Sequence, residues 1–299
     1  MAVSPDNPEM QCLKRLLTFA RTEDLGEAGD VTSSIVPEVA RATGVFVARQ
    51  ELVFCGGAML ATIAAEYSDS LQTEVAVSDG DMVGAGKALA TWSGPARSIL
   101  AAERVALNFL QRLSGIATLT RRFADAAEGT QAGIYDTRKT TPGWRALEKY
   151  AVRAGGGKNH RMGLYDAALI KDNHLAALAS DTGSDPIPSL AGLIGELRDS
   201  LPVGAFVELE VDTFDQFVDA LSLPVDIILL DNFRTDDLRE AVNARNQRTL
   251  AGKVALEASG QVTLGTVRKV AETGVDRIAI GALTHSASAV DIALEMEVQ

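Results

Sequence analysis

The side chains best suited to chemistry gather in one stretch of the chain, Asp136 to His174. It holds eight lysines and arginines against four acids, although the whole protein carries a formal net charge of -12. Two of the three histidines, His160 and His174, also lie here. Arginine and lysine recognise carboxylates and phosphates, so a local excess of cations in an acidic chain predicts a pocket for a small, highly charged anion.

An anion site is predicted where a strand-like run, Gly133–Thr137, leads into Arg138, Lys139 and two threonines. Pro142–Gly143 then signals the start of a helix. Cations, hydroxyl groups and a helix N-terminus meet there, and this combination binds anions. A solvated, charge-rich loop is the alternative, and the strand–loop–helix context favours the anion site.

The segment Gly155–Arg161 has the glycines and lysine of a phosphate loop, but Asn159 stands where such a loop requires Ser or Thr. We therefore expect a flexible loop that folds over a charged ligand. A structural role and a ligand contact both stay open for His160, which adjoins Arg161. The three histidines lack the spacing of zinc ligands, so no zinc site is predicted.

Carboxylates follow on two later strand-like runs. Glu208, Glu210 and Asp212 alternate along one run, so their side chains share a face, as they also would on an edge strand facing water. Asp231 ends the apolar run Ile227–Leu230 and is expected at the mouth of a sheet. Carboxylates in such places can hold Mg²⁺, grip ribose hydroxyls or stabilise a developing cation.

After about residue 116, strand-like runs alternate with helical segments. The runs are Gly133–Thr137, Ala167–Ile170, Phe206–Val211, Asp226–Leu230, Val254–Ala258 and Arg277–Ile280. This alternation predicts a parallel sheet with helices outside and with its chemistry at the carboxyl ends of the strands. With six or seven such units, an incomplete or distorted barrel is favoured over a doubly wound sheet.

The first part of the chain mixes helical and strand-like runs and is predicted to form a separate α/β domain over residues 1–115. A long helical pattern from residue 96 to residue 127 is expected to break at Gly115. The barrel is then expected over residues 116–283. A C-terminal helix over about residues 284–299 is expected to pack back on the first domain, and Leu175–Pro202 is expected to be a surface loop.

Composition narrows the class of protein. A chain of 299 residues with 46% hydrophobic residues can bury a large core. The sequence pI of about 4.8 argues against nucleic acid and anionic membranes as partners. No apolar run is long enough to span a bilayer, and residues 1–11 lack the apolar core of a signal peptide. Cys12 and Cys55 are isolated, so a cytoplasmic protein with reduced thiols is expected.

Eight blocks of sequence, in order along the chain, resemble the quinolinate phosphoribosyltransferase family. They are EDLGEAGDVTS (Glu23–Ser33), ERVALNFLQRLSGIAT (Glu103–Thr118), DTRKTTPG (Asp136–Gly143), GGGKNHRMGLYDAALIKDNH (Gly155–His174), VELEVD (Val207–Asp212), LLDN (Leu229–Asn232), ASG (Ala258–Gly260) and GVDRIAIGALTHS (Gly274–Ser286). Several blocks are long and chemically unusual, so together they are far more specific than one short motif.

The resemblance implies a type II phosphoribosyltransferase fold, in which an open α/β sandwich joins a distorted, seven-stranded α/β barrel. It implies a pentosyltransferase that moves phosphoribosyl from phosphoribosyl diphosphate to quinolinate. The products would be nicotinate mononucleotide, diphosphate and CO₂, in the biosynthesis of NAD. Mg²⁺ would accompany phosphoribosyl diphosphate, with no organic cofactor. The chain would form a homodimer or a hexamer of dimers, with Arg104 entering the neighbouring chain's pocket.

The same resemblance implies roles for individual residues. For quinolinate they are Arg104, Arg138, Lys139, Thr140, His160, Arg161 and Lys171. For phosphoribosyl diphosphate they are Lys139, Glu210, Asp231, Ser259, Gly260, Gln261, Ile280, Gly281 and Ala282. The catalytic group would be Lys139, Lys171, Glu210 and Asp231, the two acids also holding Mg²⁺. Gln261 is a departure, because many members have a second glycine there.

Two other functions stay open at this point. A phosphoribosyltransferase of the same fold could act on nicotinate or another acceptor, but a monocarboxylate needs fewer cations than this chain provides. A non-catalytic, anion-binding relative is the other alternative, and it would be expected to lose Glu210 or Asp231, which are both present. No side chain is assigned as a nucleophile, because the implied reaction needs no covalent intermediate.

Overall fold

The computed structural model describes residues 7–182, 187, 190–248, 250 and 252–299. The chain forms two compact units. The first consists of residues 1–121, 139–157 and 282–299, and the second of residues 122–138 and 158–281. The expected domain boundary at residues 115 and 116 therefore falls inside the first unit, and the chain passes between the units more than once.

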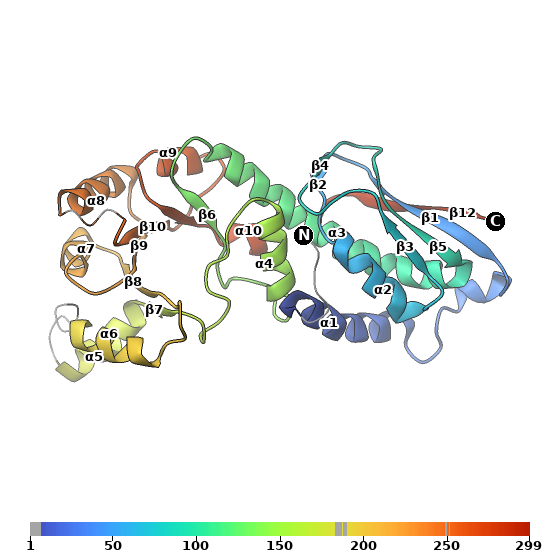
Figure 1. Cartoon of the computed structure of the whole chain (residues 1–299), viewed down its shortest axis with the longest axis horizontal. Helices are drawn as coiled ribbons and strands as arrows, with labels where there is room; N and C mark the ends of the chain where they lie inside the picture. Colours follow the sequence, from blue (N-terminus) through green and yellow to red (C-terminus); the bar gives the residue numbers. More distant parts are fainter. Residues whose placement is uncertain (1–6, 183–186, 188–189, 249, 251) are drawn as a thin grey trace. The chain divides into compact units, whose positions relative to one another are not determined.

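The first unit is built on a four-stranded antiparallel sheet whose strand order is β12-β1-β5-β3. These strands are β1 (Arg41–Ala48), β3 (Gln72–Val75), β5 (Ala88–Pro95) and β12 (Ile292–Val298), and a separate pair joins β2 (Leu52–Val53) to β4 (Met82–Val83). The helices that begin in this unit are α1 (Pro8–Leu25), α2 (Leu60–Tyr67), α3 (Ala96–Ala126), α4 (Arg145–Ala154) and α10 (Ala282–His285), with 3₁₀ turns at Thr32–Ile35 and Gly57–Met59. Figure 1 labels these strands and α-helices.

The C-terminal segment is a strand, so the expected helix over residues 284–299 is wrong. Only Ala282–His285 is helical, and β12 pairs antiparallel with β1 along its whole length. The sequence IALEMEV explains the difference, because apolar and charged residues alternate with the period of two that suits a strand. β12 thus extends the sheet of the first unit.

The helix α3 runs without a break through Gly115, contrary to the expectation of two helices. A Cβ atom at this position would lie 2.1 Å from the carbonyl oxygen of Ser288. Gly115 is therefore explained by the close approach of the backbone at residues 288 and 289, which only glycine allows.

The second unit contains a six-stranded parallel sheet in the order β6-β11-β10-β9-β8-β7. The strands are β6 (Gly133–Tyr135), β7 (Ala168–Ile170), β8 (Val207–Val211), β9 (Ile227–Asp231), β10 (Ala255–Ser259) and β11 (Arg277–Ala279). The helices that begin and end in this unit are α5 (Asp172–Thr182), α6 (Leu190–Ser200), α7 (Phe214–Ala220), α8 (Thr235–Gln247) and α9 (Val267–Ala271). Each predicted strand is present, within a residue or two of its expected bounds.

The strand order identifies a barrel-like sheet. From β7 to β11 the spatial order follows the chain order, and no reversal marks the switch point of a doubly wound sheet. The sheet has six strands among the described residues, one fewer than the seven expected. The place of a seventh beside β6 is taken by a single parallel bridge between Tyr135 and Lys158.

The expected surface loop over Leu175–Pro202 is also wrong. The helices α5 and α6 occupy most of it, and residues 183–186, 188 and 189 lie outside the described part. Leucine and isoleucine side chains of both helices line an apolar pocket together with β7: Leu178, Leu190, Leu193, Ile194 and Leu197. Apolar residues at this helical spacing were the signal for helices. No helix in the described part of the chain is long and apolar enough to cross a membrane.

Candidate active site

Several of the polar residues predicted from the sequence lie where the parallel strands of the second unit end. Lys171 directly follows β7, Glu210 lies near the end of β8, Asp231 ends β9 and Ser259 ends β10. Because parallel strands present their carboxyl ends at one edge, these side chains belong to the same edge of the sheet. Arg138, three residues beyond the end of β6, follows the same rule.

Lys171 and Glu210 form an ion pair between the ends of neighbouring strands. The Lys171 ammonium contacts Glu210 Oε2, with the lysine side chain 41% exposed and the glutamate 15% exposed. The Lys171 backbone amide donates a hydrogen bond of 2.9 Å to Nδ1 of His174. The pair therefore combines a solvent-exposed cation with a mostly buried carboxylate. The hydrogen bond to His174 holds the backbone of Lys171 in place.

Arg161 and Arg138 are close enough for their charges to interact. Burial and then the charge of Arg138 lower the pKa of Arg161. The Arg161 side chain donates a hydrogen bond of 3.1 Å from Nη1 to the carbonyl oxygen of Ala167, which fixes its direction. Two neighbouring guanidinium groups repel each other, and a carboxylate or phosphate bound between them would relieve that repulsion.

The segment from Lys158 to Arg161 is held in place by β6, so the expected flexible loop is wrong here. Lys158 exchanges backbone hydrogen bonds with Ile134 and Asp136. The buried Asp136 carboxylate accepts from the backbone amide of His160 at 2.8 Å and from the Asn159 side chain at 2.6 Å. Lys158 thus forms a parallel bridge beside β6, and the two residues after it are tied to Asp136.

The glycines before this segment serve close packing within the first unit. A Cβ atom at Gly155 would lie 2.4 Å from the carbonyl oxygen of Ala117, and one at Gly157 would lie 2.7 Å from a side-chain carbon of Thr120. The presence of glycine at both positions is explained by the close packing of α3, so it is not evidence of a phosphate loop.

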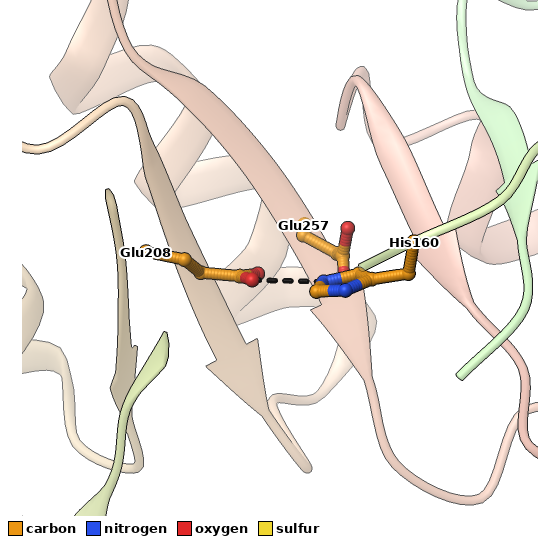
Figure 2. A group of neighbouring side chains, drawn as sticks. All are labelled: His160, Glu208 and Glu257. Atoms are coloured by element: carbon orange, nitrogen blue, oxygen red, sulfur yellow. Dashed lines mark ion pairs between the residues drawn. The ribbon is translucent and has the colours of Figure 1, made fainter. Parts of the chain in front are cut away.

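His160 points into the interior of the second unit, between two buried glutamates (Figure 2). Its Nε2 atom lies 2.8 Å from Oε2 of Glu208 and 3.4 Å from Oε1 of Glu257. Glu208 projects from β8 and Glu257 from β10, and both are fully buried. Because Glu208 belongs to a strand with neighbours on both sides, the alternative of an edge strand facing water is excluded.

Arg277 completes this interior group. Its Nε atom donates to Oε2 of Glu257, and its guanidinium lies 3.8 Å from the ring centroid of Tyr135. Phe206 contacts the His160 ring edge-to-face, with 5.4 Å between ring centroids. Two buried carboxylates are costly to place away from water, so they need a nearby cation and hydrogen-bond donors, which Arg277 and His160 provide.

His160 and Glu208 compete for one proton. Burial lowers the pKa of His160, but the hydrogen bonds and charges of Glu208 and Glu257 outweigh it and raise this pKa to about 9. Burial and the charge of Glu257 raise the pKa of Glu208. The backbone amide of Arg161 donates to Nδ1 of His160 at 2.8 Å, and a ring charged at both nitrogens could not accept that bond. The proton therefore belongs to the pair.

The three side chains have the composition of a metal site, with one ligand atom from each within 4.8 Å of the others. The hydrogen bond from the Arg161 amide argues for a different role. It occupies the Nδ1 lone pair of His160, so Nε2 carries the ring proton and has no lone pair for a cation. This hydrogen-bond pattern favours a proton-holding group over a metal site.

The ends of β9 and β10 are joined tightly. The backbone amide of Asn232 donates to the carbonyl oxygen of Ser259 at 2.9 Å, and its side chain donates to Asp231 Oδ2 at 2.7 Å. Gly260 has φ of 129° and a Cβ atom there would lie 2.6 Å from Asn232 Oδ1. Gly260 is thus required at this turn, and Gln261 beside it is exposed.

The remaining predicted residues are found as follows. Ile280 is buried after β11, its amide donating to the carbonyl oxygen of Tyr135, and Gly281 follows it in the second unit. Arg104, Lys139, Thr140 and Ala282 belong to the first unit. There Arg104 is exposed on α3, Lys139 is exposed, and Thr140 Oγ1 accepts a hydrogen bond of 3.0 Å from Arg145.

Sequence reasoning assigned no role to Glu257, Arg277 or Asp136. Each is a charged residue within or directly after an apolar strand that has neighbours in the sheet, and that placement was the available signal. Where such a residue is buried, as Glu257 and Asp136 are, it needs a partner in the interior.

Solved structures share this architecture over almost the whole chain. The nicotinate-nucleotide pyrophosphorylase of Francisella tularensis aligns with a TM-score of 0.87 at 34% identity, covering 99% of this chain and 100% of that one. The nicotinate-nucleotide pyrophosphorylase of Ehrlichia chaffeensis aligns with a TM-score of 0.84 at 38% identity, covering 99% of this chain and 100% of that one. The fold and the strand-end site thus define a phosphoribosyltransferase-type α/β protein.

Sequence comparison is more specific. Residues 18–114 match the quinolinate phosphoribosyl transferase N-terminal domain, and residues 116–295 match the C-terminal domain of the same family. Quinolinate phosphoribosyltransferase [decarboxylating] 1 of Nicotiana glauca is 39% identical, over all of this chain and 86% of its own length. A probable nicotinate-nucleotide pyrophosphorylase [carboxylating] of Bacillus subtilis is 38% identical over 95% of this chain and 93% of its own length. The chain belongs to the quinolinate phosphoribosyltransferase family.

Proposed function

We propose that this chain transfers phosphoribosyl from phosphoribosyl diphosphate to quinolinate and releases diphosphate and CO₂, forming nicotinate mononucleotide. Family membership supports the proposal. The observation that carries it is the placing of opposite charges at one sheet edge. There Lys171 pairs with Glu210, and Arg161 lies within electrostatic reach of Arg138. A dianionic acceptor needs such cations, and a developing sugar cation needs such carboxylates.

The cations are assigned to the two carboxylates of quinolinate. Arg138, Arg161 and Lys171 are supported by their place at the carboxyl edge, and Arg104, Lys139 and Thr140 by the motifs that contain them. His160 is removed from the group that touches quinolinate. Its Nε2 faces Glu208 and its Nδ1 accepts from the Arg161 amide, so neither ring nitrogen is left for a substrate carboxylate. In this proposal His160 positions Arg161.

Glu210 and Asp231 are assigned to the ribose, where the departure of diphosphate leaves oxocarbenium character. Carboxylates close to that developing charge lower the barrier, while the cations hold the acceptor nitrogen in line with the reacting carbon. The turns at Ser259–Gly260–Gln261 and Ile280–Gly281–Ala282 are assigned to phosphoribosyl diphosphate. Decarboxylation then follows on the nucleotide, because the quaternised ring nitrogen stabilises the carbanion, and no protein nucleophile is required.

Glu210 and Asp231 would also hold Mg²⁺ when it is bound with phosphoribosyl diphosphate. The donor set fits, because Mg²⁺ commonly uses one or two carboxylates together with substrate phosphates and water. Asp231 is partly exposed at its strand end, and Glu210 shares its carboxylate with Lys171. The ion would supply charge neutralisation on the diphosphate. We further propose a homodimer, or a hexamer of dimers, with Arg104 acting in the neighbouring chain's site.

The test is an assay of nicotinate mononucleotide and CO₂ from quinolinate, phosphoribosyl diphosphate and Mg²⁺, with nicotinate as the competing acceptor. Equal amounts of the two products are expected. The kcat/KM for nicotinate should be lower by at least about a hundredfold, because a missing carboxylate leaves cations of the site unmatched. Comparable kcat/KM for both acceptors would show that the second carboxylate is not recognised.

A further inference from the structure

We propose that Glu148, Arg112 and Thr284 are positioning residues that set the backbone of Lys139, the exposed lysine to which the proposed function assigns substrate anions. The inference rests on that proposed function for its catalytic consequence. All four residues belong to the first unit, and the contacts that follow are contacts within it.

Glu148 is the centre of this group. It lies on α4, is fully buried, and its two oxygens accept hydrogen bonds from two different segments. From the loop after Lys139, Thr141 donates to Glu148 through its backbone amide at 3.1 Å and its hydroxyl at 2.9 Å. From α3, Arg112 donates through Nη2 at 2.7 Å and Nε at 3.3 Å. The carboxylate thereby joins the loop to two helices.

Arg112 and Thr284 extend the contacts back to Lys139. Arg112 donates from Nη1 to the carbonyl oxygen of Ala287 at 2.8 Å, and from Nη2 to the carbonyl oxygen of Thr284. The buried hydroxyl of Thr284 then donates to the carbonyl oxygen of Lys139 at 2.8 Å. The hydrogen bonds form a circuit that grips the loop at Lys139 and again two residues later.

Hydrogen bonds contribute more than side-chain burial to holding this loop, and one of them comes from the Cys12 thiol to the Gly143 carbonyl oxygen. Lys139, Thr141, Pro142 and Gly143 are all exposed, so burial of side chains does not determine its path. A buried carboxylate is costly unless its lone pairs have donors, and here the donors come from the loop and from Arg112. The polar circuit is therefore placed to fix geometry, and geometry is what a lysine that meets a reacting anion requires.

The decisive experiment compares Thr284→Val, which replaces the hydroxyl with a methyl group of similar size, with Thr284→Ser, which retains the hydroxyl. Thr118→Val is the matched control, because it removes another buried threonine hydroxyl, bonded to the Val53 amide at 2.8 Å. We expect Thr284→Val to lower kcat at least about tenfold with little change in melting temperature, and Thr284→Ser and Thr118→Val to stay within about twofold of wild type.

The role of Lys139 is isolated by a double-variant cycle. If Thr284 acts through Lys139, adding Thr284→Val to Lys139→Ala should cost less than about twofold further in kcat. An equal loss in both backgrounds, or no loss from Thr284→Val alone, would overturn the inference. An inactive wild-type protein would instead overturn the proposed function.

A readout that needs no activity separates these failures. Hydrogen exchange of the backbone amides in residues 139–144 should accelerate at least about tenfold in Glu148→Gln and in Thr284→Val, and remain unchanged in Thr118→Val. Exchange that is equal in wild type and in both variants would show that the circuit does not hold the loop, whatever reaction the protein catalyses.

Discussion

At the scale of single residues, His160 and Glu208 share a proton inside the second unit. It lies in an interior where both glutamates are fully buried and where Arg277 already balances the charge of Glu257. The raised pKa values of His160 and Glu208 have the same sign, so the folded state binds this proton more tightly than the unfolded chain does. The free energy of unfolding must therefore decrease at alkaline pH, where this proton is lost.

The free energy of unfolding should fall as pH rises from about 6.5 to 9.5. The contribution of the pair is complete below the ordinary histidine pKa of 6.5 and is lost as pH passes the folded value of about 9. About 1–3 kcal/mol should be lost, measured by urea unfolding at pH 6.5, 8 and 9.5. Glu208→Gln should flatten this dependence, whereas the exposed Glu295→Gln should not. A wild-type profile that is level across this range would contradict the shared proton.

The two lysines of the proposed site can be separated from ordinary surface lysines by substitution. Lys139→Ala and Lys171→Ala should each lower kcat by at least about a hundredfold with unchanged unfolding transitions, because each removes a positioned charge from an anion site. Lys253→Ala, at an exposed position, is the control and should be neutral. Near-normal turnover in either site variant would return that lysine to the class of solvated surface charges.

Among the structural elements, α3 shows how packing overrides local propensity. Glycine is a poor helix residue, and yet α3 is continuous because Gly115 lets the backbone of Ser288 approach. Helix α6 contains two glycines, Gly192 and Gly195, where a Cβ atom would meet no other described segment within 4 Å. The same residue type is thus required in one helix and dispensable in the other.

Alanine substitutions should therefore have opposite effects in these helices. Gly115→Ala should destabilise the protein by about 2 kcal/mol or more, because its methyl group would overlap the Ser288 carbonyl. Gly192→Ala and Gly195→Ala should each stabilise it by about 0.5–1 kcal/mol through reduced backbone entropy. Thermal unfolding of the three variants provides the measurement. A stabilising Gly115→Ala would mean that the close approach is absent in solution.

At the scale of the whole molecule, the proposed dimer implies that each active site contains residues of both chains. Arg104 is exposed on α3 of the first unit, whereas Lys171 lies at the sheet edge of the second unit. If each site takes Arg104 from the neighbouring chain, one intact site can be assembled from two different defective chains.

Arg104→Ala and Lys171→Ala should each be nearly inactive alone. Mixed under conditions of subunit exchange, they should regain activity approaching half the wild-type value per heterodimer, because one site receives intact Lys171 and the partner's intact Arg104. The other site lacks both. Exchange is followed with two differently tagged chains and native mass spectrometry. Demonstrated exchange without any regained activity would place Arg104 within its own chain's function.

The local pattern of apolar and polar residues was enough to predict the strands of the second unit and the charged residues at their ends. The six strands of the second unit were predicted because buried parallel strands are short apolar runs, and such runs are visible without any partner. The cations and carboxylates at their ends followed from the same rule, since a residue such as Asp231 or Lys171 that ends an apolar run must lie at the sheet edge.

Tertiary structure decided what depends on residues distant in the sequence. Glu257 looks like any strand glutamate until neighbours on both sides bury it against His160, and Gly115 looks like a helix breaker until Ser288 packs against it. The C-terminal strand needed β1 as its partner, and the loop of Lys139 needed Glu148 and Thr284. Periodicity shows which side of an element is apolar, but it does not show which segment packs against that side. The packing partner decides which charges are buried and must be paired, and where two backbones come close.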